Sequence, residues 1–320
     1  MSLKKIIDLV LTRKEFSEKP PVLMDIGASG GLHEVWKYIA PHAICIAFDA
    51  DSRDLQLSEK EDKGFRKIYV FNRIATDKKK DTALDFYLTQ NPHCSSTLKP
   101  LAKDLSEYHF APYFEIDKIE KLPAITLPEV LDSTQLNYID WFKTDTQGTD
   151  LRLFNSLPSD IKNKILAVEL EPGIIDAYEG EDKLTDVLDT LSKTGYQILN
   201  FNVRGPVKLK AEQYSSVFNS NLKQKLAKNF LTQIPGWVEL YFTQSLDNQH
   251  FTLREWLLSW VFTTVQGHHA AAYSIAEKGL THYKDAQLLT LKNYSEKAMR
   301  QEIFSLNNIV KATKLFFKNL

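Results

Sequence analysis

The stretch PVLMDIGASGG, from Pro21 to Gly31, decides the fold. Its first part is a continuous apolar run, which is typical of a strand buried on both faces of a parallel sheet. The run ends in glycines, which allow a tight turn and a close approach of the backbone to a ligand. A helical pattern that carries Val35, Trp36 and Ile39 follows. The order strand, glycines, helix predicts the first unit of an open α/β sheet.

Strand and helix patterns continue to alternate up to about residue 245. Short apolar runs predict strands over 43–50, 68–76, 85–89, 138–148, 165–173, 196–202 and 237–243. Helical patterns lie between them, over 125–132, 150–158 and 183–195. The 85–89 run suits an edge or hairpin strand, and residues 90–120 suit an irregular excursion. We therefore expect an α/β fold whose seven-stranded, mostly parallel, doubly wound sheet has an antiparallel last strand at its edge.

The composition changes near residue 250, after which only helical spacing is found. We expect a first domain over residues 1–249, with an N-terminal helix at 1–17 and a core over about 20–245. An all-helical C-terminal domain is expected over residues 250–320. These helices are a candidate surface for forming a homo-oligomer.

The charge balance excludes several classes of protein. Lys and Arg total 40 and Asp and Glu total 41, so the net charge of −1 creates no global field toward nucleic acid or anionic lipid. No run approaches the roughly 20 apolar residues that span a bilayer. The N-terminus lacks the pattern of a secretory signal, and two cysteines cannot form a disulfide framework. We expect a soluble, cytoplasmic protein.

A nucleoside site is predicted at the glycine turn. The turn spans Asp25 to Gly31, and Asp49 follows the second predicted strand, 24 residues after Asp25. A carboxylate at that place can accept hydrogen bonds from both ribose hydroxyls. The glycine spacing differs from the G-x-G-x-x-G of dinucleotide sites, which argues against a pyrophosphate grip. The competing interpretation is a tight turn beside a surface aspartate.

A second polar cluster lies at the ends of two later strands. Asp145 ends the 138–148 strand, Lys143 shares its strand face, and Glu169 ends the next strand. Lys143 forms either a structural pair with Asp145 or Glu169, or part of a catalytic set. If the strands are neighbours, Asp145 and Glu169 converge on one crevice. Convergent carboxylates could deprotonate a hydroxyl or hold a divalent cation.

These motifs together resemble a known family. The order DIGASGG, FDAD, RIATDKK, CSSTLKP, ITLPEVLD, KTDTQGTD and VELEPG is similar to that of the FkbM-type methyltransferases, over about residues 20–245. The resemblance implies the seven-stranded Rossmann-like methyltransferase sheet with S-adenosyl-L-methionine as cofactor. It also implies transfer of a methyl group to a hydroxyl, chiefly of sugars, glycans and polyketides.

The resemblance also implies site residues. Those expected to bind the cofactor are Asp25, Gly27, Ala28, Gly30, Asp49, Ala50, Ile74, Ala75 and Asp145. Those expected to act in catalysis are Asp145, Glu169 and Lys143, with no metal. The chain departs from the family in two places: Asp49 stands where Glu followed by Pro is more frequent, and the tail after residue 250 lies outside the family's core.

Two other functions compete with an O-methyltransferase acting on a small-molecule or glycan hydroxyl. One is a non-catalytic or weakly catalytic interaction protein that keeps the sheet and binds partners through its helical tail. The other is an NAD-dependent oxidoreductase, which would need the pyrophosphate glycines that the turn lacks. The 203–236 connector is either a lid over the acceptor or a solvated insertion. His93 to Ser96 look like a nucleophile set but lie in one short loop.

Overall fold

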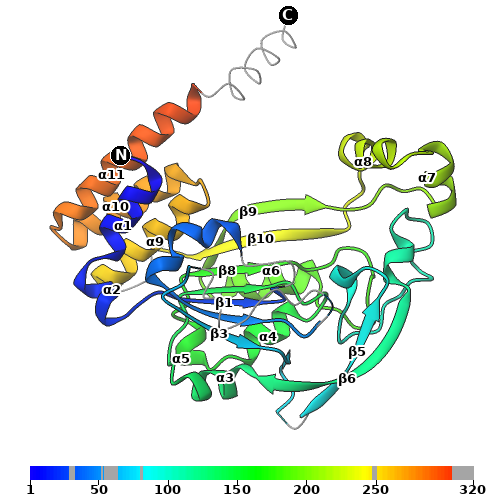
Figure 1. Cartoon of the computed structure of the whole chain (residues 1–320). Helices are drawn as coiled ribbons and strands as arrows, with labels where there is room; N and C mark the ends of the chain where they lie inside the picture. Colours follow the sequence, from blue (N-terminus) through cyan, green and yellow to red (C-terminus); the bar gives the residue numbers. More distant parts are fainter. Residues whose placement is uncertain (29–32, 52, 54–63, 80–81, 247–250, 305–320) are drawn as a thin grey trace, which may run out of the picture. The chain divides into compact units, whose positions relative to one another are not determined.

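The computed structural model describes the chain except for residues 29–32, 52, 54–63, 80–81, 247–250 and 305–320 (Figure 1). The chain divides into two compact units. The first, called the sheet unit here, comprises residues 22–33 and 43–245. The second, called the helical unit, comprises residues 1–21, 34–42 and 246–320.

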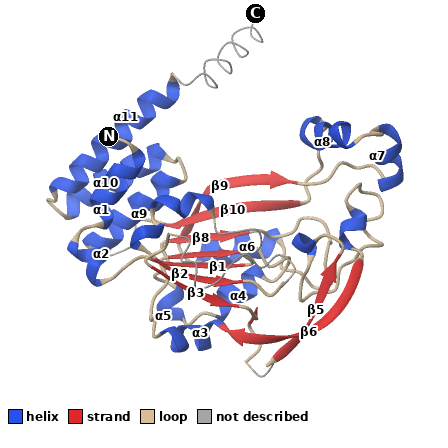
Figure 2. Ribbon diagram, viewed as in Figure 1, coloured by secondary structure: helices blue, strands red, loops and turns tan. Residues whose placement is uncertain are grey.

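The sheet unit contains a seven-stranded sheet in the order β3-β2-β1-β7-β8-β10-β9 (Figure 2). Its strands are β1 (Val22–Ile26), β2 (Ile44–Phe48), β3 (Lys67–Phe71), β7 (Trp141–Thr144), β8 (Ala167–Leu170), β9 (Tyr196–Arg204) and β10 (Trp237–Gln244). The pairs from β3 through β8 are parallel. The predicted mixed α/β fold, with a mostly parallel seven-stranded sheet and a C-terminal helical region, is confirmed.

The position of the antiparallel strand was predicted wrongly. β10 pairs antiparallel with both β8 and β9, so it lies inside the sheet and β9 forms the edge. The long connection after β9 allows β10 to enter between two strands already laid down. Apolar periodicity reports that a strand is half buried, but it does not report which strands are its neighbours.

One face of this sheet carries the main hydrophobic core. The helices that follow β6, β7 and β8 contribute apolar side chains to the same cluster as Met24, Phe142 and Val168. These helices are α3 (Leu127–Thr134), α4 (Asp150–Ser156), α5 (Ser159–Lys162) and α6 (Leu184–Lys193). α3 begins at a capping box between Thr126 and Glu129. The core thereby fixes the carboxyl ends of the parallel strands, where the loops lie.

A second, three-stranded sheet has the order β4-β6-β5. Its strands are β4 (Ile74–Thr76), β5 (Ala83–Thr89) and β6 (Ile116–Thr126). The predicted 68–76 strand is therefore divided between two sheets, and the end of the expected 90–120 excursion is a strand. Charged residues interrupt the apolar pattern of β6, which hid it. Two short 3-10 turns, η3 (Pro92–Cys94) and η4 (Ala111–Phe114), lie between β5 and β6.

The connector between β9 and β10 forms an arm over residues 205–236. It carries α7 (Ala211–Val217) and α8 (Asn221–Phe230). The arm packs on the β5–β6 connection, because His109 Nδ1 lies 3.2 Å from the backbone N of Val207 and its ring lies 4.6 Å from that of Tyr214. The 90–120 excursion and the 203–236 connector therefore pack together.

The helical unit contains α1 (Leu3–Leu11), α2 (Lys14–Glu18), η1 (Glu34–Tyr38), η2 (Ala40–His42), α9 (Leu253–Val265), α10 (His269–His282) and α11 (Ala286–Ile303). The N-terminal helix belongs to this unit and not to the sheet unit, contrary to the expected division. Arg13 pairs with Asp285 at 3.0 Å, and the Arg254 guanidinium donates to the Lys19 carbonyl. The helix expected after the glycine turn is replaced by η1 and η2.

None of the helices in the described part of the chain combines the length and the apolar character needed to cross a membrane.

Candidate functional site

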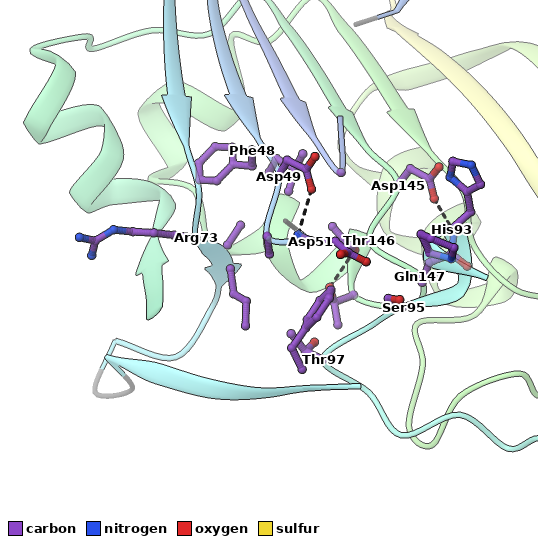
Figure 3. Close-up of a pocket in the computed structure, with 18 residues that line it drawn as sticks. Phe48, Asp49, Asp51, Arg73, His93, Ser95, Thr97, Asp145, Thr146 and Gln147 are labelled. Carbon is purple, nitrogen blue, oxygen red and sulfur yellow. Dashed lines mark hydrogen bonds between the residues drawn. The ribbon is translucent and has the colours of Figure 1, made fainter. Parts of the chain in front are cut away.

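A pocket lies at the carboxyl ends of β1, β2 and β7, the edge of the sheet where open α/β folds bind ligands (Figure 3). The expected site residues among its lining are Gly27, Asp49, Ala50, Ile74, Ala75 and Asp145. They come from four separate segments of the sequence. The structure therefore brings most of the predicted set to one cavity.

The glycine turn needs glycine at its first position. Gly27 has φ +87°, and a Cβ built there would lie 2.1 Å from the backbone oxygen of Asp145. The N–H groups of Gly27 and Ala28 both donate to the Phe48 carbonyl, at 3.2 and 2.9 Å. The ends of β1, β2 and β7 are therefore closed against one another at this point. Gly30 lies outside the described residues.

The acid after β2 is held by its own loop. Asp49 is 4% exposed, and its Oδ1 accepts the backbone N–H of Asp51 at 3.0 Å. Asp51 pairs with Arg53 at 2.7 Å, and Arg53 also donates to the Thr89 carbonyl and to the Ser95 hydroxyl. Burial alone would raise the pKa of Asp51, but Arg53 outweighs it and lowers that pKa. These bonds connect the β2 loop to the segment that follows β5.

Asp145 is the carboxylate after β7 and lines the pocket. Its backbone N–H donates to the Ile26 carbonyl at 2.9 Å, and its Oδ1 accepts from Gln147 Nε2 at 2.6 Å. Burial raises the pKa of Asp145 to about 6, and Lys143 acts in the opposite direction. A carboxyl group with this pKa can exchange a proton near neutral pH.

Glu171 is electrostatically linked to Asp145. Burial and the charge of Asp145 hold the pKa of Glu171 well above its usual range. Asp150 joins the two loops, because its carboxylate accepts the backbone N–H of Thr146 at 2.9 Å and that of Glu171 at 3.0 Å. Asp150 stands in the KTDTQGTD motif and Glu171 in the VELEPG motif. No rule of residue spacing predicts that the Asp150 carboxylate joins the two loops.

Lys143 forms an ion pair with Asp25, at 2.8 Å. We expected its partner to be Asp145 or Glu169. The register explains the difference, because Asp25 and Lys143 stand directly opposite each other on β1 and β7. Asp25 is fully buried, and neither residue lines the pocket. Burial alone would lower the pKa of Lys143, but Asp25 and the nearby carboxylates outweigh it and raise that pKa.

Glu169 lies on the sheet, opposite Lys143 in the register of β7 and β8. It accepts the indole N–H of Trp141 at 2.8 Å and lies 3.4 Å from His33 Nε2. Like Ala28, it is not part of the pocket lining. Asp145 lines this pocket and Glu169 does not, although the charges of both act on Lys143.

The His93 to Ser96 loop forms one wall of the pocket. Ser95 accepts from Arg53 and from the Thr89 backbone, while Ser96 donates to the Gln147 carbonyl at 2.8 Å. Burial raises the pKa of the Cys94 thiol to about 12. A thiol with that pKa stays protonated, so the loop is a support for the pocket and not a nucleophile set.

Several pocket residues were missed from the sequence. They are side chains brought in from the second sheet and its loops: Arg73, Phe86, Pro92, His93 and Thr97. Arg73 stands in the motif RIATDKK, Thr97 in CSSTLKP and His93 in the nucleophile-like loop, but none was predicted to line the cofactor site. No local pattern indicates Phe86 or Pro92. Among the described residues, no group of three or more His, Cys, Asp or Glu side chains is arranged to hold a metal ion.

The fold and the pocket define the class of protein. A seven-stranded sheet of this kind, with a glycine turn after β1 and acids after β2 and β7, is consistent with the methyltransferase fold. A model of the Methyltransferase FkbM domain matches residues 38–198, just over half of the chain. The chain belongs to the FkbM methyltransferase family, and the resemblance seen in its motifs is confirmed.

The match begins after the glycine turn and ends in β9, so neither the turn nor the C-terminal helices lie within it. A comparison with curated proteins finds no match.

Proposed function

We propose that this methyltransferase uses S-adenosyl-L-methionine and transfers the methyl group to a hydroxyl, with a saccharide or related metabolite as acceptor. The observation that carries the proposal is the meeting of Gly27, Asp49 and Asp145 in one pocket at the carboxyl edge of the sheet. The family supports methyl transfer. The cofactor and the acceptor class are our inference.

The chemistry of the lining fits the proposed cofactor. Asp49 can take the ribose hydroxyls, and Phe48, Ile74 and Ala75 offer apolar surface to an adenine ring. Gly27 brings backbone, with no side chain, to the place where β1 and β7 meet. When bound, the cofactor supplies an electrophilic methyl group on a positively charged sulfur. The carboxylates of Asp49 and Asp145 provide a complementary negative field.

Asp145 is the proposed group that receives or orients the acceptor proton. It lines the pocket, and its raised pKa places its proton exchange near the working pH. Gln147 holds one carboxylate oxygen, so the direction of the other is restricted. Alignment of the reacting groups supplies the larger share of the rate, about 7–11 kcal/mol in well-oriented cases, and a base adds about 10²–10⁴-fold.

Asp25, Lys143 and Glu169 receive supporting roles in this proposal. The Asp25–Lys143 pair joins β1 to β7 directly below the glycine turn and Asp145. Its function is to keep the two strand ends together, so that Gly27 and Asp145 stay in contact. Glu169 holds the Trp141 indole and acts on the sheet, not on the acceptor.

The acceptor is expected to lie between the pocket and the arm. A saccharide hydroxyl is supported by the polar lining, which includes His93, Thr97 and Gln147, and by the resemblance to sugar-modifying members of the family. We also infer a cytoplasmic location, which the two free cysteines support.

Calorimetry with S-adenosylmethionine, S-adenosylhomocysteine and NAD tests the cofactor, and labelled methyl transfer to a panel of sugars tests the acceptor. We expect both S-adenosyl compounds to bind and NAD not to bind. Binding of NAD alone would identify an oxidoreductase instead. Absence of any nucleotide binding would identify an interaction protein that keeps the methyltransferase sheet.

A further inference from the structure

The arm exposes a continuous apolar stripe. On α8, Leu222, Leu226 and Phe230 follow one another at intervals of four residues and are 69%, 47% and 81% exposed. Residues at this spacing lie on the same side of a helix. Val217 and Leu231, at the ends of the two helices, are 60% and 39% exposed. Exposed apolar side chains gathered in this way indicate a contact surface.

The stripe is not the side by which α8 is attached. Ala227 is buried in a small cluster with Val207 and Tyr214, and the Tyr214 hydroxyl donates to the Gln224 carbonyl at 2.7 Å. Around the helix, Ala227 and Gln224 stand on a different side from the stripe. The attachment to the sheet unit therefore fixes α8 while leaving the stripe in solvent.

The surroundings of the stripe are basic. α8 contains Lys223, Lys225 and Lys228 and no acidic residue. The whole arm has five lysines against the single acid Glu212, in a chain whose net charge is −1. Lys210 is paired with Glu107, and Lys225 and Lys228 border a hollow together with His109 and Tyr113. The net charge of the whole chain does not indicate this basic patch, because acidic residues elsewhere balance it.

We propose that the arm binds the surface of an anionic lipid bilayer. A helix that lies in the interface inserts its Leu and Phe side chains among the acyl chains and places its lysines at the headgroups. Lysines next to a membrane are attracted by anionic lipids. By helical spacing Lys223 and Lys225 flank the stripe on its two sides, as this mode of binding requires.

A second copy of the chain fits this surface less well. A two-fold contact would bring the same patch of both copies together. Lys223 and Lys225 would then face their own equivalents, with no acidic residue on either α8 to compensate. Like charges at close range oppose such a contact.

The test is co-sedimentation of the full chain with vesicles of phosphatidylcholine alone and of phosphatidylcholine with phosphatidylglycerol. We expect binding to the anionic vesicles that weakens with added salt. The variant Leu222→Ser, Leu226→Ser, Phe230→Ser is expected to bind roughly tenfold less or worse. Replacing the three lysines of α8 with glutamine is expected to reduce binding roughly fivefold for each charge.

The matched control is Ile119→Ser, Leu289→Ser, Phe304→Ser, which removes side chains that are 54%, 51% and 76% exposed elsewhere. This control should bind vesicles like the original chain. Equal binding by the α8 serine variant would overturn the proposal. So would absence of vesicle binding by the original chain, or sedimentation showing a dimer that the serine variant loses. The assay needs no methyl transfer, so its outcome is independent of the proposed function.

Discussion

Two groups of carboxylates lie at or near the ends of the parallel strands and differ in their contacts. Asp49 and Asp145 line the pocket at the strand ends, while Asp25 and Glu169 lie on the sheet face beside Lys143. The pocket acids are held mainly by loop amides, and Asp145 has a raised pKa. The difference shows that a carboxylate near a glycine turn is not thereby part of the binding surface.

The separation arises from where β7 ends. Lys143 is inside β7 and stands between Asp25 and Glu169 across the sheet, so its charge is neutralised there. Asp145 is past the last strand residue, Thr144, and enters the loop that forms the pocket. Two positions along the chain thus separate the lysine that pairs within the sheet from the proposed base at the pocket.

The largest expected effect comes from breaking the buried pair. Lys143→Met leaves the carboxylate of Asp25 buried without its counter-charge, and we expect the free energy of unfolding to fall by about 3–5 kcal/mol. Urea unfolding followed by tryptophan fluorescence measures it. The double variant Asp25→Asn, Lys143→Met should recover most of the loss, because no buried charge remains. If Lys143→Met is stable but has lost turnover, Lys143 takes part in catalysis. The distinction between the pocket carboxylates and those beside Lys143 would then no longer hold.

The next effect is on turnover. Asp145→Asn keeps the oxygen that Gln147 contacts but cannot take a proton, so we expect turnover to fall by about 10²-fold with little change in stability. Affinity for S-adenosylhomocysteine, measured by calorimetry, should stay within roughly threefold. Unchanged turnover would move the base to another residue, with Glu171 the first to test.

The Asp145 carboxyl group also predicts how turnover depends on pH. Burial raises the pKa of Asp145 to about 6, so its basic form is complete above that pH and is lost as the pH falls through about 6. The turnover of the original chain should therefore decline on acidification with a midpoint near 6. In Asp145→Asn the residual turnover, measured over the same pH range, should not show this decline on acidification.

A smaller effect is expected for the acid after β2. Asp49→Asn removes the charge offered to the ribose hydroxyls, so affinity for S-adenosylhomocysteine should weaken by roughly ten- to hundredfold. Asp160→Asn, an exposed acid on α5, is the matched control and should leave calorimetric affinity unchanged. Equal affinity in both variants would place the nucleoside elsewhere.

The smallest effect is expected at Glu169. Gln can still accept the Trp141 N–H, so Glu169→Gln should change initial rates of methyl transfer by less than about threefold. A loss as large as that of Asp145→Asn would put Glu169 in the chemistry. The two groups of acids would then act together, contrary to the comparison.

Much of the fold could be predicted from the sequence because strands buried on both faces are continuous apolar runs. β1, β2, β7 and β8 were found in this way, whereas β10 was found from alternating apolar and polar positions. The charged strand β6 was not, since its exposed positions resemble a loop. The helix expected around Trp36 was wrong as well: Pro41 cannot donate a backbone hydrogen bond, and the segment forms 3-10 turns with bonds such as Ile39 N–H to Trp36 O.

The sequence by itself determined the family, the glycine turn and the acids that follow β2 and β7, because these depend on local order and residue type. Only the tertiary structure decided that Lys143 pairs with Asp25, that Asp150 joins the loops of Thr146 and Glu171, and that β10 enters the sheet beside β8. These outcomes depend on register and strand order. Distant segments acquire both only when they pack, and no periodicity within one segment encodes them.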